Sequence, residues 1–233
     1  MEGILYNSFL KSVAKNEKQL AILIDPEKFT ISETKSFLKK IPKETTQLFV
    51  GGSTVENGQT EETVNALKAE TKLPIFLFPG DYSHITPLAD ALLFLTLLSG
   101  RNAEYLVGQQ IKSISKLKNT SLEIISTGYI LIDGGNNSSV SKVTNTEPLP
   151  QENIEEIVNT ALAGQYMGAK LIYLEAGSGA IFPIKPEIIS EVKLAINIPL
   201  IVGGGIKTET QKQAVYKAGA DMVVMGTAFE NTP

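Results

Sequence analysis

Three segments of the sequence share one form, an apolar run that leads into glycine. They are residues 170–180 (KLIYLEAGSGA), 198–205 (IPLIVGGG) and 221–227 (DMVVMGT). Because glycine has no side chain, a ligand can approach the backbone there, and backbone N–H groups can bind an anion. Each glycine run alone could be an ordinary tight turn, but the three together predict a shared anion site.

A carboxylate lies at the end of the first of these runs. Glu175 separates the apolar residues 171–174 from the turn Gly177-Ser178-Gly179. A carboxylate at the end of a buried strand is a candidate for acid/base chemistry. Tyr173 lies two residues earlier and therefore shares its strand face. The alternative is a solvated residue at the edge of the sheet.

Two oxygen-bearing side chains end the first two predicted strands. Asp25 ends the apolar run 19–26, and Ser53 follows the run 46–52. These oxygens suit a hard cation, since Mg²⁺ in enzymes is typically held by one or two protein oxygens together with phosphate oxygens of the substrate. The alternative for Asp25 is an Asp-Pro turn that starts a helix.

His84 and Asp133 are weaker candidates. His84 is the single histidine of the chain, so any Ser-His-Asp mechanism would have to use it. We expect a structural or solvent-exposed role for it. Asp133 precedes Gly134-Gly135 and is expected to form a turn first and to contribute to a site only second.

Composition excludes several classes of function. The chain has 233 residues, of which 42% are hydrophobic and 20% charged, and a net charge of -4, which argues against a nucleic-acid binder. It has no cysteine, which excludes disulfides and thiolate-bound zinc and favours a cytoplasmic protein. The apolar run 91–98 is too short to span a membrane, and residues 1–10 lack the apolar core of a signal peptide.

The elements that would position these residues alternate between strand and helix. Apolar runs predict eight strands, at residues 19–26, 46–52, 73–80, 91–98, 122–126, 171–176, 198–203 and 222–226. Helices are predicted at residues 30–40, 61–71, 103–117, 154–168, 186–195 and 208–219, with capping boxes at Thr30–Glu33 and Thr208–Gln211. This order predicts an α/β fold with a parallel sheet, and the count of eight favours a closed TIM (β/α)8 barrel in a single domain, residues 1–233.

Three parts of the chain fit this scheme less regularly. We expect a turn at Gly128 and a second short extended piece up to Asp133. Residues 134–150 are rich in Gly, Asn, Ser and Thr, which predicts a loop over the barrel mouth. Only residues 228–233 follow the eighth strand, so we expect an irregular or truncated last unit.

In such barrels the active site lies at the carboxyl ends of the strands, and phosphate commonly binds by the loops after strands seven and eight. Gly203-Gly204-Gly205 and Gly226-Thr227 occupy those two places. Together they predict a phosphate-binding barrel.

Six motifs in order resemble one known family across nearly the whole chain. They are LIDPEK (23–28), VGGST (50–54), ILIDGG (130–135), YLEAGSGA (173–180), VGGGI (202–206) and MGTAFE (225–230). These motifs resemble those of the geranylgeranylglyceryl phosphate synthases. The bacterial members of that family and one archaeal branch carry this version of the motifs.

The resemblance implies a Mg²⁺-dependent prenyltransferase of ether lipid biosynthesis. Such an enzyme joins sn-glycerol 1-phosphate to a polyprenyl diphosphate, here geranylgeranyl diphosphate, and releases diphosphate. By position, Asp25 and Ser53 would hold Mg²⁺, and Glu175 would take the proton of the attacking hydroxyl. Glycerol phosphate would be held by Tyr173, Leu174, Glu175, Ala176, Gly177, Ser178, Gly179, Gly204, Gly205, Gly226 and Thr227, with Gly203 adjoining.

A polyprenyl tail needs a long apolar groove, and the candidates for its walls are Phe76, Phe78, Phe94, Tyr105 and Tyr129. We also expect a homo-oligomer and transient contact with a membrane surface for the lipid product. Two alternatives stay open: another phosphate-binding barrel of the sugar-phosphate isomerase or epimerase type, and a barrel that binds a phosphometabolite without catalysis.

Overall fold

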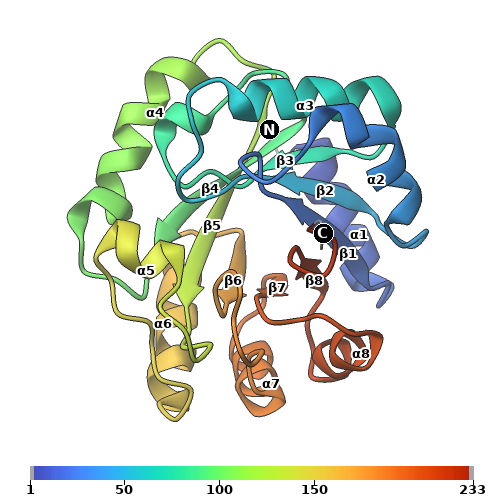
Figure 1. Ribbon diagram of the computed structural model, residues 1–233. Coiled ribbons are helices and arrows are strands. Elements are labelled where there is room, and N and C mark those ends of the chain that lie inside the picture. Colours follow the sequence, from blue (N-terminus) through green and yellow to red (C-terminus); the bar gives the residue numbers. More distant parts are fainter. Residues whose placement is uncertain (1–2, 231–233) are drawn as a thin grey trace.

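Eight parallel strands form a closed barrel in the computed structural model, which describes residues 3–230 (Figure 1). Each strand pairs with the next in sequence, and β8 pairs with β1 to close the ring. The strands are β1 (Gln19–Ile24), β2 (Gln47–Val50), β3 (Ile75–Leu77), β4 (Ala91–Leu97), β5 (Glu123–Leu131), β6 (Leu171–Glu175), β7 (Leu200–Gly203) and β8 (Met222–Met225). The predicted TIM barrel is confirmed.

The helices surround the barrel, as Figure 1 shows in a view along its axis. They are α1 (Ile4–Ala14), η1 (Ile31–Glu33), α2 (Thr34–Lys40), α3 (Gln59–Glu70), η2 (Tyr82–His84), η3 (Glu104–Gly108), α4 (Gln109–Leu117), α5 (Ser139–Thr144), α6 (Ile154–Tyr166), α7 (Pro186–Ala195) and α8 (Glu209–Lys217). The predicted helix 186–195 has these bounds, and the capping box of Thr208 and Gln211 is formed. The capping box predicted at Thr30 is wrong, because its side chain makes no capping hydrogen bond and the segment begins as a 3-10 turn.

Alternate residues of each strand face opposite layers of the core. Phe49 and Tyr173 belong to the apolar cluster inside the barrel, whereas Leu48 and Leu174 belong to the cluster between barrel and helices. Since both faces of each strand are covered, the strands read as continuous apolar runs.

The sequence analysis missed helix α1, whose Tyr6 and Phe9 join the interior cluster. The carboxylate of Glu123 at the start of β5 accepts hydrogen bonds from the backbone N–H groups of Leu5 and Tyr6, both at 2.7 Å. The N–H groups of the first helical turn have no acceptor within the helix, and Glu123 supplies one for these two. The helix is thereby fixed to the barrel end opposite to the carboxyl ends of the strands.

Strand β5 corrects one prediction. It runs without a break through Gly128, where we expected a turn. A Cβ at Gly128 would lie 2.8 Å from the Cδ1 atoms of Ile172 and Leu98. This glycine therefore permits close packing of neighbouring segments and does not bend the chain.

The segment predicted as a loop, residues 134–150, contains α5. Ser138 caps this helix by accepting a hydrogen bond from Ser141 N, and Leu149 forms a parallel bridge with Ile132. The loop prediction is therefore wrong for the helical part.

The most irregular unit lies between β3 and β4. There β3 has three residues, and the connection to β4 contains only the 3-10 turn η2. We also expected an irregular last unit. No helix follows β8 among the described residues, and residues 231–233 lie outside them, but the β1–β8 pairing closes the barrel.

Candidate active site

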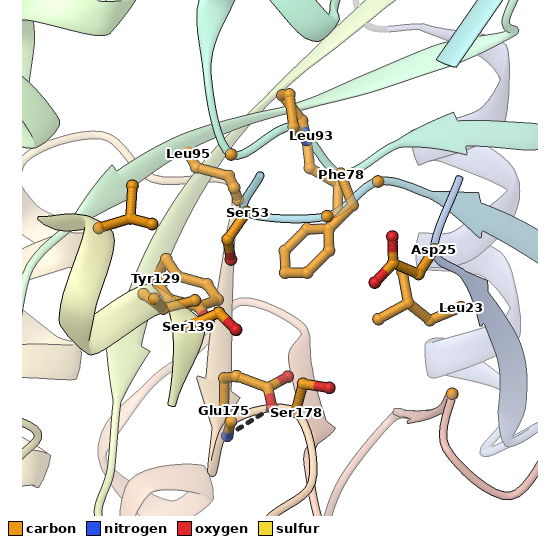
Figure 2. A pocket seen from close by; sticks show the side chains of 18 of the residues that line it. Leu23, Asp25, Ser53, Phe78, Leu93, Leu95, Tyr129, Ser139, Glu175 and Ser178 are labelled. Carbon is orange, nitrogen blue, oxygen red and sulfur yellow. Dashed lines mark hydrogen bonds between the residues drawn. The ribbon is translucent and has the colours of Figure 1, made fainter. Parts of the chain in front are cut away.

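One cavity of about 240 Å³ lies at the carboxyl ends of the strands. It brings together side chains and glycines from β1, β2, β6, β7 and β8, and Figure 2 shows several of them around one space. Of the predicted site residues, those that line it are Asp25, Ser53, Glu175, Gly177, Ser178, Gly204, Gly205, Gly226 and Thr227.

Glu175 is the buried acid of this cavity, with 6% of its surface exposed. Its Oε1 accepts a hydrogen bond from Gly177 N at 2.7 Å, drawn as a dashed line in Figure 2, which fixes the carboxylate at the turn after β6. Burial raises the pKa of Glu175 to about 7, while the Gly177 N–H and the Tyr173 hydroxyl act in the opposite direction. A carboxylate with a pKa near neutrality is suited to accept a proton.

The glycines of the β7 loop approach Glu175 closely. Gly204 and Gly205 have φ angles of 81° and 71°, a region that favours glycine. A Cβ on Gly204 would overlap the Glu175 carboxylate and lie 2.7 Å from the backbone N of Ala176. Gly226 after β8 has ordinary space, since a Cβ there would lie 3.4 Å from that of Leu23. Only glycine fits at Gly204, whereas Gly226 leaves free room beside the cavity.

Asp25 and Ser53 fit a Mg²⁺ site. Asp25 Oδ1 accepts a hydrogen bond from Glu27 N at 3.1 Å, and Oδ2 lies 3.6 Å from Lys28 Nζ. Burial raises the pKa of Asp25, so a nearby cation would stabilise its charged form. Residues 3–230 hold no cluster of three or more His, Asp or Glu side chains placed for a metal. A carboxylate and a hydroxyl that line the same cavity are nevertheless the small protein donor set that Mg²⁺ takes beside phosphate oxygens.

Five predicted substrate residues do not line the cavity: Tyr173, Leu174, Ala176, Gly179 and Gly203. Leu174 and Ala176 are buried in the layer towards the helices, which leaves only their backbones for a ligand. Tyr173 is fully buried beneath Glu175, and a Cβ on Gly203 would lie 2.6 Å from its hydroxyl. The assignment of all five residues to the substrate site stays a prediction.

The cavity continues into an apolar arm. Four of the five aromatic residues proposed for a groove line it: Phe78, Phe94, Tyr105 and Tyr129. Phe76 does not, because its side chain packs inside the barrel, 5.6 Å from the ring centre of Phe49. The lining includes Leu93, from the barrel interior, and Leu92, from the outer layer. The arm therefore passes from the barrel mouth to the outer side of β4.

The weaker candidates take structural roles. His84 is buried and does not line the cavity. Asp133 accepts a hydrogen bond from Gly135 N at 2.8 Å, which is the expected turn.

Sequence reasoning missed two parts of the cavity wall. Lys28 lines the cavity and forms an ion pair with Glu230 at 3.0 Å, so it places a cation beside Asp25. Helix α5 contributes Val140, Val143 and Thr144. Val143 and Thr144 lie three and four residues after Val140, and this helical spacing behind the cap Ser138 was the available signal.

Comparison with known proteins identifies the family of this chain. Residues 12–233 match the PcrB family. The chain is 54% identical to the geranylgeranylglyceryl phosphate synthase of Zunongwangia profunda, over 97% of each chain. It is 49% identical to the protein of the same name from Flavobacterium johnsoniae, over 97% of this chain and 94% of the relative. The chain belongs to the PcrB family.

The fold of this PcrB family member also matches a crystal structure of a similar protein. That structure is (S)-3-O-geranylgeranylglyceryl phosphate synthase from Thermoplasma acidophilum in complex with substrate sn-glycerol-1-phosphate. The TM-score is 0.90 at 34% identity, over all of this chain and 93% of the other. The predicted family resemblance is confirmed.

Proposed function

We propose that this chain is a geranylgeranylglyceryl phosphate synthase. It transfers a polyprenyl group, in our proposal geranylgeranyl, from its diphosphate to a hydroxyl of sn-glycerol 1-phosphate, and this ether forms part of a lipid. The observation that carries the proposal is the full-length match to the Thermoplasma acidophilum enzyme, whose structure holds sn-glycerol-1-phosphate. The cavity supports it, because a polar end with glycines and a buried acid continues into an apolar arm.

Glu175 acts as the general base in this proposal. The attacking alcohol is a weak nucleophile, and a positioned carboxylate helps by accepting its proton. Burial raises the pKa of Glu175 to about 7, so near neutral pH a large share of the protein carries the basic form. The hydrogen bond from Gly177 N holds the acceptor oxygens in place.

The glycines of β7 and β8 bind the phosphate of glycerol phosphate. Gly204, Gly205, Gly226 and Thr227 all line the cavity, and their backbones leave room for an anion. This places the phosphate at the same end of the cavity as Glu175, which meets the substrate through its hydroxyls and not through the phosphate.

Asp25 and Ser53 hold Mg²⁺ in this proposal, in a site that the diphosphate oxygens complete. The bound ion would neutralise the negative charge that develops on the departing diphosphate. Lys28, beside Asp25, adds a cationic side chain at the same wall.

The apolar arm takes the polyprenyl chain. Phe78, Phe94, Leu93 and Leu95 give it an apolar wall without charge. A sugar-phosphate isomerase would have no use for such an arm, and a barrel that only binds a phosphometabolite would not need a desolvated acid at Glu175. These two features favour the prenyltransferase over both alternatives.

A turnover assay tests the proposal. Purified protein with sn-glycerol 1-phosphate, geranylgeranyl diphosphate and Mg²⁺ should release diphosphate and form an ether that resists alkali. The sn-glycerol 3-phosphate enantiomer and a reaction with excess chelator are the controls, and both should react far more slowly. Absence of product with every prenyl diphosphate tested would refute the proposed function.

Three further proposals concern the setting of the enzyme. A cytoplasmic location is proposed on the lack of cysteine. No helix within residues 3–230 has the length and apolar character needed to cross a bilayer. Transient contact with a membrane surface is proposed because the product is a lipid. A homo-oligomer is supported by exposed apolar side chains of Val107, Ile111 and Ile114 along η3 and α4.

A further inference from the structure

A single aromatic ring lies in the middle of the cavity. Phe78 follows β3, and Figure 2 shows its ring between Ser53 and Asp25, with Glu175 below it in this view. Under the proposed function, Asp25 and Ser53 border the place where the diphosphate leaves, and Glu175 lies where the nucleophile is held. The ring therefore borders the space in which the carbon that changes partners must lie.

The Phe78 ring is held by neighbouring rings. It stacks on Tyr173 at 5.1 Å between ring centres with an interplanar angle of 24°, and lies 5.8 Å from Tyr129. Tyr129 and Tyr173 are themselves in edge contact at 5.5 Å, and both are buried. Phe78 is only half-buried and lines the cavity, so part of its ring is open to a ligand.

The reaction creates positive charge at that place. The bond between the allylic carbon and diphosphate breaks, and both electrons leave on the diphosphate oxygen. A lone pair of the glycerol hydroxyl then forms the new carbon–oxygen bond, and the hydroxyl proton passes to Glu175. Between these two events the allylic carbon carries much of a positive charge.

A carboxylate close to this carbon would stabilise the charge but could also capture it as an ester. The face of an aromatic ring attracts a cation without offering an electron pair for a covalent bond. The aliphatic side chains that line the cavity near Phe78, Leu23, Leu93 and Leu95, offer no such attraction, and the ring of Tyr129 is more deeply buried than that of Phe78.

We propose that Phe78 is a catalytic residue whose ring face stabilises the developing allylic cation. The inference rests on the proposed function and deepens it. The buried Tyr173 supports the ring from behind and keeps it at a fixed position while the substrate carbon moves from one oxygen to the other.

The test is a series of fluorinated phenylalanines at position 78, with one, two and three fluorines. Each fluorine weakens the cation attraction of the ring while its shape changes little. We expect the single-turnover rate to fall stepwise along the series, by about 2- to 30-fold in total for a contact of this kind. KM for glycerol 1-phosphate should stay nearly constant, because the ring acts on the charged transition state.

Phe76 provides the matched control. It lies two residues earlier, is buried, and does not line the cavity. The same fluorinated series at Phe76 should leave the rate unchanged. Phe78→Leu should lower the rate at least as far as the trifluorinated ring.

The outcomes separate this inference from the proposed function. If the wild-type protein turns over and the rate does not depend on fluorine number at position 78, the ring is only a wall and the inference is wrong. If fluorination changes KM for the prenyl diphosphate alone, Phe78 binds the chain and does not stabilise the cation. If the wild-type protein forms no ether at all, the proposed function itself has failed.

Discussion

Replacing Glu175 by glutamine should change stability and catalysis in ways that depend on pH. Burial raises the pKa of this carboxyl from 4.5 to about 7 in the folded protein. Below pH 4.5 the side chain is neutral in both folded and unfolded chains, so ionisation costs the folded state nothing. Between pH 4.5 and 7 the unfolded chain ionises while the folded protein retains the proton, and stability therefore falls as pH rises.

The size of this effect follows from the pKa difference. At 1.36 kcal/mol per pH unit, the step from 4.5 to about 7 corresponds to about 3 kcal/mol above pH 7. Glutamine does not ionise, and its Oε1 can still accept the hydrogen bond from Gly177 N. We expect Glu175→Gln to be more stable than wild type by up to about 3 kcal/mol at pH 8, and by only about 1 kcal/mol at pH 5. For a chain of this length that is about 6–12 °C in Tm.

Thermal unfolding of both proteins at several pH values between 5 and 8 measures this difference. Glu191→Gln is the matched control, because Glu191 on α7 is exposed and bonds to no other described residue. Its stability should follow that of wild type at every pH. A difference between Glu175→Gln and wild type that does not change from pH 5 to 8 would show that Glu175 is not desolvated as the structure indicates.

The Glu175→Gln variant also tests whether Glu175 is the general base. Loss of a general base typically lowers kcat about 10²- to 10⁴-fold. We expect such a fall for Glu175→Gln, with a smaller change in KM for glycerol phosphate. In the wild type, kcat/KM should rise with pH through about 7 as Glu175 loses its proton. A Gln variant that raises only KM would leave Glu175 as a positioning residue.

Four other variants test the remaining parts of the site and the exposed face of α4. Asp25→Ala should abolish turnover at low Mg²⁺ while circular dichroism shows an intact fold, and near-normal activity would remove Asp25 from the metal site. Gly226→Ala should weaken binding of glycerol phosphate, because the added methyl group lies beside the cavity, and should leave binding of the prenyl diphosphate unchanged. The fold should stay intact, because this Cβ has ordinary space. Gly204→Ala should also destabilise the protein, since the new Cβ would overlap Glu175; equal thermal stability of the two Ala variants would contradict this. Ile111→Glu should reduce the mass measured by light scattering if the exposed face of α4 joins two copies, and an unchanged oligomer would exclude that face.

The sequence predicted the barrel because its strands are buried on both faces and appear as apolar runs of the right length. It predicted the polar end of the cavity for a related reason. Asp25, Ser53, Glu175 and Gly204 each follow one of these runs, and parallel strands bring their carboxyl ends to one face. Position in the strand was enough to bring these residues together.

What the sequence could not supply depended on contacts between distant segments. Gly128 resembles a turn residue, and only the Ile172 and Leu98 side chains beside it show that it allows close packing. Helix α1 is held by Glu123, more than a hundred residues away. The raised pKa of Glu175 likewise comes from burial, which no single residue type reveals.

The irregular third unit explains how a barrel of this kind can hold a long apolar substrate. In a regular unit, a helix covers the outer face of the barrel between two neighbouring strands. Here β3 ends at Leu77, pairs with β4 at two positions, and is followed only by the turn η2. Phe78 thus leaves the sheet and enters the cavity, and Leu92 and Phe94 of β4 line the arm. Under the two proposals, the shortened unit brings the ring beside the reacting carbon and opens the path for the polyprenyl chain, so one local irregularity would serve both the chemistry and the substrate.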